Sequence, residues 1–171
     1  NLENKAVVDH LWGAKDSVVR SYLRDGVDGW RLDVAFDIGF NPLEALTKAA
    51  HAEKPGSLVV GEIPNCPREW FASVDGVMHF GLRKLMIALA NREIDGPSFQ
   101  RMAARMVRDA DYEHMLKSWL YLDNHDTFRL STTVPDAKAR KLAQVLLFTL
   151  PGAVNLYYGS EVAMEGGDDP E

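Results

Sequence analysis

Short apolar runs that end at a carboxylate recur three times along this chain, and they limit the folds open to it. The first run covers residues 30–34, follows two glycines and contains both Arg31 and Asp33. Because side chains alternate along a strand, these two charged residues would share one face. Desolvating such a pair roughly cancels its attraction, so stability alone is a poor reason to place it there. We interpret the run as a functional site; the alternative is a structural ion pair at a strand end.

Helical patterns separate the strand-like runs. The expected strands cover residues 30–34, 57–63, 76–80, 119–123 and 153–158. The expected helices cover much of the first two dozen residues, then residues 41–54, 68–72, 82–92, 98–108 and 135–150. Asn41 and Pro42 are typical of an N-cap and a first helical position. Strands that alternate with helices predict a parallel sheet in an α/β fold.

Five strands fit either a doubly wound open sheet or part of a (β/α)8 barrel. An open sheet of this kind usually binds a nucleotide through a Gly-rich first turn, and the sequence has no such loop. In a barrel, catalytic side chains come from the C-terminal ends of several strands, and Asp33, Glu62 and Asp126 follow such ends. A barrel typically needs roughly 250 residues. We therefore expect residues 1–171 to form one domain, a partial TIM barrel without its first strands.

The composition excludes several classes of partner. With 46% hydrophobic residues, the chain can bury a sizeable core. A net charge of -6 without clustered Lys or Arg argues against nucleic acid and anionic membrane surfaces. No apolar stretch reaches the roughly 18 residues of a membrane span, and the N-terminus lacks the layout of a signal peptide. Half a parallel barrel would expose two sheet edges, so we expect self-association or pairing with other chains.

The single cysteine, Cys66, excludes an internal disulfide and a Cys-based metal site. It also favours a cytoplasmic location, as does the missing signal layout. The chain begins at Asn1 rather than at Met. We therefore expect that its natural beginning lies further upstream.

Carboxylates that converge at one end of a barrel suit the cleavage of glycosidic bonds. Asp33 lies beside the cationic Arg31, which favours the ionised form that a nucleophile needs. Glu62 follows apolar residues and has no cation next to it in the sequence, which favours a proton-donor role. His125 and Asp126 could hold sugar hydroxyls. The alternative for this last pair is a local hydrogen bond in a loop.

Three segments resemble, in order, the second, third and fourth signature regions of the α-amylase family, glycoside hydrolase family 13. They are residues 26–33, residues 60–62 and residues 124–127. The separation of 29 residues between Asp33 and Glu62 is also similar to that of the family. Trp30 is similar to its counterpart in the neopullulanase and cyclomaltodextrinase branch.

The resemblance implies a role for each site residue. Asp33 would be the nucleophile of a retaining double displacement, and Glu62 the general acid/base. Asp126 would be a third carboxylate that helps to distort and hold the sugar. Arg31 would be the partner of the nucleophile, and His125 a ligand of a sugar hydroxyl. The implied activity is hydrolysis or transglycosylation of α-1,4-linked glucan oligosaccharides, such as maltooligosaccharides from starch.

The chain also departs from the family pattern. The first signature region, an Asp and an Asn-His pair, has no counterpart before Asp33. The resemblance therefore implies roughly the fourth to eighth strand-helix units, in a fragment with low or no activity alone. A non-catalytic carbohydrate-binding or interaction module is the alternative. Ser160 stands where the family often has Asp, and we expect a looser loop there. Calcium often accompanies the family, but we assign no residue to it.

Overall fold

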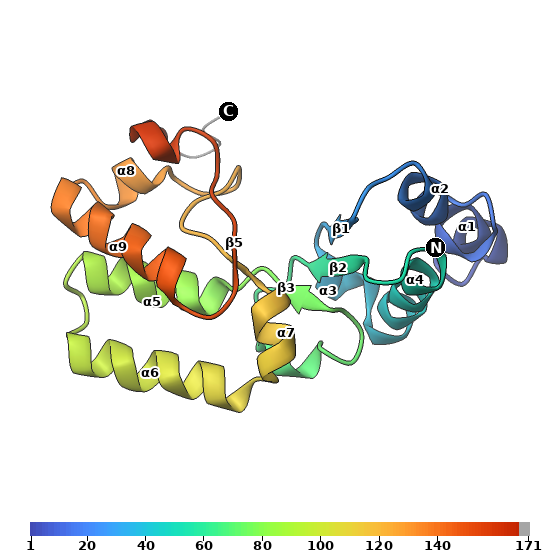
Figure 1. Ribbon diagram of the computed structural model, residues 1–171, viewed down its shortest axis with the longest axis horizontal. Helices are drawn as coiled ribbons and strands as arrows, with labels where there is room; N and C mark the ends of the chain where they lie inside the picture. The colour runs from blue at the N-terminus through green and yellow to red at the C-terminus, as the bar shows by residue number, and fades with distance from the viewer. Residues whose placement is uncertain (168–171) are drawn as a thin grey trace. The chain divides into compact units, whose positions relative to one another are not determined.

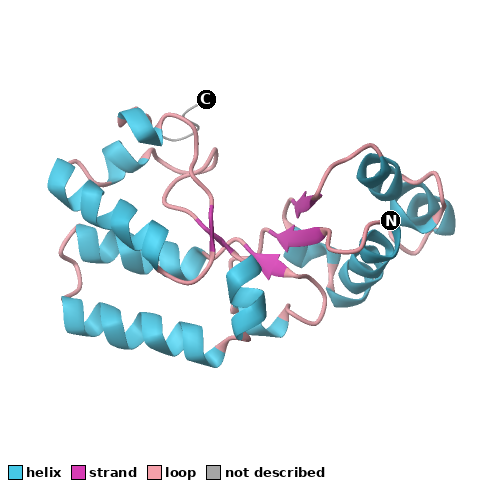
Figure 2. Ribbon diagram, in the orientation of Figure 1, coloured by secondary structure: helices cyan, strands magenta, loops and turns pink. Residues whose placement is uncertain are grey.

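The computed structural model describes residues 1–167 of the chain, whose elements fall into two compact units (Figure 1). The first unit comprises Asn1–Met78, and the second begins at His79. Helical segments separate consecutive strands within each unit (Figure 2). The expected single domain over residues 1–171 stays a prediction.

The first unit contains a three-stranded sheet with helices between its strands. Its helices are α1 (Lys5–Val8), α2 (Val18–Arg24), α3 (Ala35–Ile38) and α4 (Phe40–Glu53), with a π-helical turn at Asp9–Gly13 and a 3-10 turn at Pro67–Glu69. Its strands are β1 (Gly29–Leu32), β2 (Leu58–Gly61) and β3 (Gly76–Val77). The strands pair in the order β1-β2-β3, and both pairs are parallel. Helix α4 packs against α2 and β2.

Two glycines allow close approaches beside the first two strands. A Cβ atom at Gly29 would lie 2.1 Å from the carbonyl oxygen of Leu58 on the neighbouring strand. A Cβ atom at Gly61 would lie 3.2 Å from the Cβ of Ala35 and 2.7 Å from the Cδ1 of Ile63. The first contact involves backbone and cannot be relieved by a side-chain rotation. Glycine at position 29 is therefore needed for β1 and β2 to pair in their observed register.

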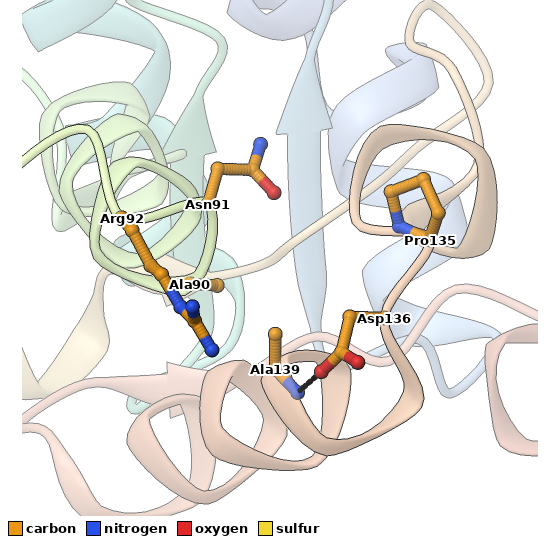
Figure 3. Close-up of a pocket in the computed structure, with 6 residues that line it drawn as sticks. All are labelled: Ala90, Asn91, Arg92, Pro135, Asp136 and Ala139. Atoms are coloured by element: carbon orange, nitrogen blue, oxygen red, sulfur yellow. Dashed lines mark hydrogen bonds between the residues drawn. The ribbon is translucent and has the colours of Figure 1, made fainter.

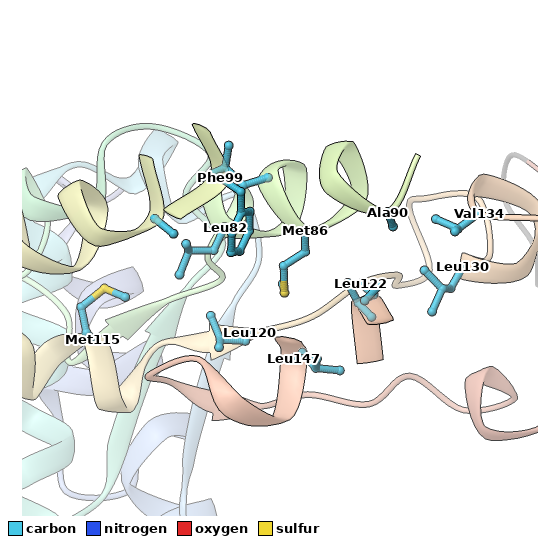
Figure 4. Close-up of a cluster of buried hydrophobic side chains, with 13 residues drawn as sticks. Leu82, Met86, Ala90, Phe99, Met115, Leu120, Leu122, Leu130, Val134 and Leu147 are labelled. Carbon is cyan, nitrogen blue, oxygen red and sulfur yellow. The ribbon is translucent and has the colours of Figure 1, made fainter. Parts of the chain in front are cut away.

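The second unit is mainly helical. Its helices are α5 (Phe80–Ala90), α6 (Gly96–Asp109), α7 (Tyr112–Lys117), α8 (Leu130–Thr133) and α9 (Ala137–Thr149), with a 3-10 turn at Ser160–Val162. Strands β4 (Trp119–Leu120) and β5 (Ala153–Val154) form a parallel pair. An apolar core joins side chains of α5, α6, α7, β4, α8 and α9 (Figure 4).

Three helices of this unit begin at an aspartate N-cap. The side chains of Asp95, Asp111 and Asp136 accept hydrogen bonds from backbone amides in the first turns of α6, α7 and α9. Each carboxylate satisfies an amide that the helix itself leaves without a partner. The hydrogen bond from the side chain of Ser98, followed by that from its backbone amide, holds the pKa of Asp95 below its usual value.

Parallel pairing and strand-helix alternation are confirmed, but several boundaries are wrong. The strands end earlier than expected and fall into two sheets within the described residues. Helix α4 begins at Phe40, and its N-cap is Gly39 with a φ of 86°, so Asn41 is not the cap. The short helices α3, α7 and α8 were not predicted. Whether these are the fourth to eighth units of a barrel stays a prediction.

Among residues 1–167, no helix combines the length and the apolar character that crossing a bilayer requires.

Candidate active site

Asp33 and Glu62 follow neighbouring strands of the first unit at the same edge of the sheet. Asp33 comes directly after β1, and Glu62 directly after β2. The parallel register pairs Leu32 with Gly61, so the two carboxylate residues occupy equivalent positions just beyond the paired strands. The amide of Glu62 donates to the carbonyl of Leu32 at 2.9 Å, which extends the pairing to the site itself.

One guanidinium contacts both carboxylates. Arg31 Nη1 donates to Asp33 Oδ1, and Arg31 Nη2 lies 3.0 Å from Glu62 Oε2. The side chain of Asp33 is 72% exposed, whereas that of Glu62 is only 16% exposed. The expected contact between Arg31 and Asp33 is thus present. The two carboxylates differ in access: solvent, and by extension a substrate, reaches Asp33 far more easily.

Glu62 has no cation next to it in the sequence, where its neighbours are apolar, but it has one in the structure. Arg31 is 31 positions away in the chain, yet the parallel register brings its guanidinium to Glu62 Oε2. The same oxygen also accepts a hydrogen bond from the backbone amide of Val34 at 2.9 Å.

Val34 is a site residue that the sequence analysis missed. Its backbone lies in the left-handed region, with φ 42° and ψ 43°, between Asp33 and helix α3. Only a few per cent of residues other than glycine have positive φ, and a β-branched residue is a marked outlier. Nothing in the sequence signals this conformation, since valine there predicts extended strand.

His125 and Asp126 lie in the second unit, in the loop between β4 and α8. His125 Nε2 is 3.2 Å from Asp126 Oδ2, and both side chains are about half exposed. Asn124 is buried, and its backbone amide donates to Thr127 Oγ1 at 3.0 Å, which shapes the loop. The local contact between His125 and Asp126 is therefore present, and both side chains remain accessible to a ligand. The structure brings together the predicted residues within each unit.

The buried carboxylate of Asp123 accepts hydrogen bonds from two other segments beside this loop. Asp123, which precedes the loop, is 3% exposed and accepts from the amide of Leu130 at 2.9 Å. The hydroxyl of Ser160 lies 2.8 and 2.9 Å from the two oxygens of Asp123. The expectation of a looser loop at Ser160 is therefore wrong, because this serine is buried and tied to the region of His125 by a charge-assisted hydrogen bond.

The C-terminal segment, residues 157–166, makes further contacts with the start of α8. The guanidinium of Arg129 is fully buried and lies 4.4 and 4.3 Å from the ring centres of Tyr157 and Tyr158. Arg129 Nη1 also donates to the carbonyl of Tyr158 at 2.5 Å. The amide of Gly166 donates to Thr132 Oγ1 at 3.0 Å, and Ser131 donates to the carbonyl of Met164.

A surface hollow of about 310 Å³ lies in the second unit, where α5 ends and α9 begins (Figure 3). Asn91 and Arg92 line it from the turn after α5, and Asp136 lines it as the N-cap residue of α9. The carboxylate of Asp136 already caps α9 by accepting from the amide of Ala139 at 2.7 Å (Figure 3). None of the predicted site residues lines this hollow. We therefore place the candidate active site at the strand ends.

No cluster of three or more His, Cys, Asp or Glu side chains suited to a metal ion occurs within residues 1–167. Calcium is still assigned to no residue of this chain.

Comparison with known proteins decides the family. The model of the α-amylase catalytic domain matches residues 1–169. The chain belongs to the α-amylase family. This confirms the resemblance carried by the signature segments around Asp33, Glu62 and Asp126, and the fold of this family's catalytic domain is a (β/α)8 barrel.

Curated relatives in the family include neopullulanase 2 of Thermoactinomyces vulgaris, which is 32% identical over 99% of this chain and 29% of its own length. A cyclomaltodextrinase of Thermoanaerobacter pseudethanolicus is 34% identical over 98% of this chain and 32% of its own length. A solved structure of a cyclic α-maltosyl-(1→6)-maltose hydrolase from Arthrobacter globiformis has a TM-score of 0.92 and 28% identity. The match covers 99% of this chain and 39% of the chain of that hydrolase. The chain thus spans about a third of the length of its curated relatives.

Proposed function

We propose that this chain supplies catalytic residues of a retaining glycoside hydrolase or transglycosylase that acts on α-1,4-linked glucan oligosaccharides. The observation that carries the proposal is the contact of one guanidinium, that of Arg31, with both Asp33 and Glu62. A retaining mechanism needs two carboxyl groups close together, one as nucleophile and one as acid. The names of the relatives, neopullulanase and cyclomaltodextrinase, support the class of substrate.

The two carboxylates would act in turn. Asp33 would attack the anomeric carbon while Glu62 protonates the departing glycosidic oxygen, giving a covalent bond between the sugar and Asp33. Glu62 would then remove a proton from water, or from the hydroxyl of a second sugar, as that molecule displaces Asp33. The exposure of Asp33 suits a group that must reach the substrate, and Arg31 favours its ionised form.

The loop of the second unit would hold the sugar. We propose that Asp126 is the third carboxylate, which interacts with the ring as positive charge develops on it. His125 would donate a hydrogen bond to a sugar hydroxyl. The accessibility of both side chains supports these roles.

The chain alone is expected to have low or no activity and to self-associate. Large apolar side chains on the exposed face of α9, among them Leu142, Val145 and Phe148, support an association of this kind. Sedimentation as a monodisperse monomer would count against it.

Hydrolysis of maltooligosaccharides and of α-maltosyl fluoride tests the catalytic roles. We expect Asp33→Asn to abolish the reaction of both substrates, because both need the nucleophile. Glu62→Gln should abolish the reaction of maltooligosaccharides and spare the first step with the fluoride, because fluoride leaves without protonation. Asp28→Asn is the matched control, since Asp28 is an exposed carboxylate paired with Lys54 at 2.7 Å.

Each outcome bears on the proposal. The chain can be assayed alone, or the substitutions can be placed in a full-length protein that contains this segment. Unchanged hydrolysis of maltooligosaccharides by Glu62→Gln would contradict the proposed function. A Glu62→Gln substitution that left binding and every measured activity unchanged would favour the alternative, a carbohydrate-binding or interaction module.

A further inference from the structure

The strained residue beside the nucleophile lies against the proposed acid. Val34 has φ 42°, and the other described non-glycine residues with positive φ are Arg92 and Ala163. Val34 is the β-branched member of this set. Such a conformation persists only where the surrounding structure fixes it, and strain of this kind is concentrated at functional sites.

The backbone on both sides of Val34 is fixed to Glu62. The amide of Ala35 donates to the backbone carbonyl of Glu62 at 3.1 Å, and the amide of Glu62 donates to the carbonyl of Leu32 at 2.9 Å. Ala35 is fully buried, close to Gly61. The left-handed turn at Val34 therefore lets two consecutive amides reach Glu62. Val34 donates to the side chain, and Ala35 donates to the main chain.

The contacts of Glu62 are asymmetric. Its Oε2 accepts from the amide of Val34 at 2.9 Å and lies 3.0 Å from Arg31 Nη2. Its Oε1 makes no hydrogen bond or ion pair to any residue within 1–167. An oxygen that accepts a hydrogen bond from an amide and lies beside a guanidinium is a poor place for a proton, whereas the other oxygen of the same carboxyl group has room for one.

We propose that Val34 is a positioning residue for Glu62. Its amide anchors Oε2, so that Oε1 is the oxygen that delivers the proton to the glycosidic bond and later takes one from water. This inference rests on the proposed role of Glu62 as general acid/base. The strained backbone of Val34 directs this amide at the carboxylate of Glu62. The chain enters α3 at the next residue.

The contact can be tested in the 171-residue chain by an NMR titration that needs no catalytic activity. We expect the amide proton of Val34 to shift with pH at the same midpoint as the carboxyl carbon of Glu62. The amide of Ala35 is the internal control and should shift severalfold less, because it donates to the backbone carbonyl. Glu62→Gln should abolish the shift at Val34. A Val34 amide that does not follow the midpoint of Glu62 would overturn the proposal.

Two substitutions separate the amide from the side chain. Val34→Gly keeps the N–H and tolerates positive φ, so the midpoint of Glu62 should be unchanged. Val34→Pro removes the N–H and, because its ring fixes φ at roughly −65°, also removes the left-handed turn, so the contact with Glu62 is lost and the midpoint of Glu62 should differ from that in Val34→Gly. If the carboxyl group of Glu62 titrates at the same midpoint in the natural chain, in Val34→Gly and in Val34→Pro, the proposal is overturned. If Val34→Pro does not fold, the titrations of the natural chain and of Glu62→Gln decide.

An active protein that contains this segment gives a kinetic readout of the same role. Val34→Pro should lower kcat more than it changes KM, and should move the alkaline limb of the pH profile of kcat/KM. Asp28→Asn, at the exposed carboxylate paired with Lys54, should leave both in place. An unmoved alkaline limb in a folded Val34→Pro protein would contradict the positioning role. Hydrolysis of maltooligosaccharides by Glu62→Gln would instead overturn the proposed function, so the two failures are distinguishable.

Discussion

Protonation of His79 should set an acid limit on the stability of the second unit. His79 is 3% exposed and caps helix α5, where its Nδ1 accepts from the amide of Leu82 at 3.2 Å. Burial lowers the pKa of His79 from 6.5 to about 4. The hydrogen bond also requires a neutral ring, because a protonated Nδ1 would face another donor. The positive end of the helix dipole disfavours a cation there as well.

The size of the effect follows from the two pKa values. The unfolded chain takes up a proton on this histidine near pH 6.5, whereas the folded chain does so only near pH 4. The stability linked to His79 is therefore present above pH 6.5 and is lost as the pH falls toward 4. Each unit of difference corresponds to about 1.4 kcal/mol, so the full effect is about 3 kcal/mol. Between pH 7 and pH 5 it amounts to about 2 kcal/mol.

Urea unfolding followed by circular dichroism at pH 7 and pH 5 measures this loss. His79→Asn is the comparison, because asparagine is a good N-cap and does not titrate. We expect the natural chain to lose about 2 kcal/mol of unfolding free energy over this interval, and the variant to lose much less. The pKa values of Asp28, Glu53 and Asp95 are lowered, chiefly by hydrogen bonds, so these groups reduce stability only at lower pH. An equal loss in both proteins would refute the reasoning.

Two further substitutions test the packing around the site. Gly29→Ala should cost about 2 to 4 kcal/mol in urea unfolding, because the new methyl group would overlap the carbonyl of Leu58 and force β1 away from β2. Ser160→Ala should cost about 1 to 3 kcal/mol, because it removes a donor from the buried carboxylate of Asp123.

Matched controls exist for both changes. Gly96→Ala adds the same methyl group at the start of α6, where nothing lies within 4 Å, and should be nearly neutral. Ser98→Ala removes a hydroxyl that accepts from Arg101 and hydrogen-bonds to the carboxylate of Asp95 at the surface, and should cost less than Ser160→Ala, whose partner is buried. A Gly29→Ala protein as stable as Gly96→Ala would contradict the observed register. Equal effects at positions 98 and 160 would contradict the role of the buried hydrogen bond.

The parts of the fold and site that the sequence predicts are those set by local pattern. Apolar runs and helical spacings gave the alternation and the parallel pairing, because periodicity depends on neighbouring residues alone. The positions of Asp33 and Glu62 beyond their strands could be predicted for the same reason. Charged residues at the ends of apolar runs indicate the edge of a parallel sheet. In the structure, Asp33 and Glu62 lie at this edge.

The missed features depend on contacts between distant residues. The cation beside Glu62 is Arg31, which only the strand register brings there. The backbone of Val34 contradicts the strand propensity of valine because hydrogen bonds to Glu62 on either side fix it. Ser160 is fastened by Asp123, which lies 37 positions earlier. The comparison of Ser160 with the family pattern did not include its partner Asp123, and it therefore predicted a looser loop than the structure has.

The contacts of the C-terminal segment, residues 157–166, affect the order in which the second unit folds. Arg129, Ser131 and Thr132 bind atoms of this segment across separations of 29, 33 and 34 positions. Closing loops of this length costs chain entropy, whereas the hydrogen bonds of α9 between them join near neighbours and form fast. We therefore expect the burial of Arg129 against the rings of Tyr157 and Tyr158 to be a late event on the folding pathway. Until it occurs, the guanidinium stays hydrated, and hydrogen exchange at the amide of Arg129, which donates to the carbonyl of Gly166, reports that step.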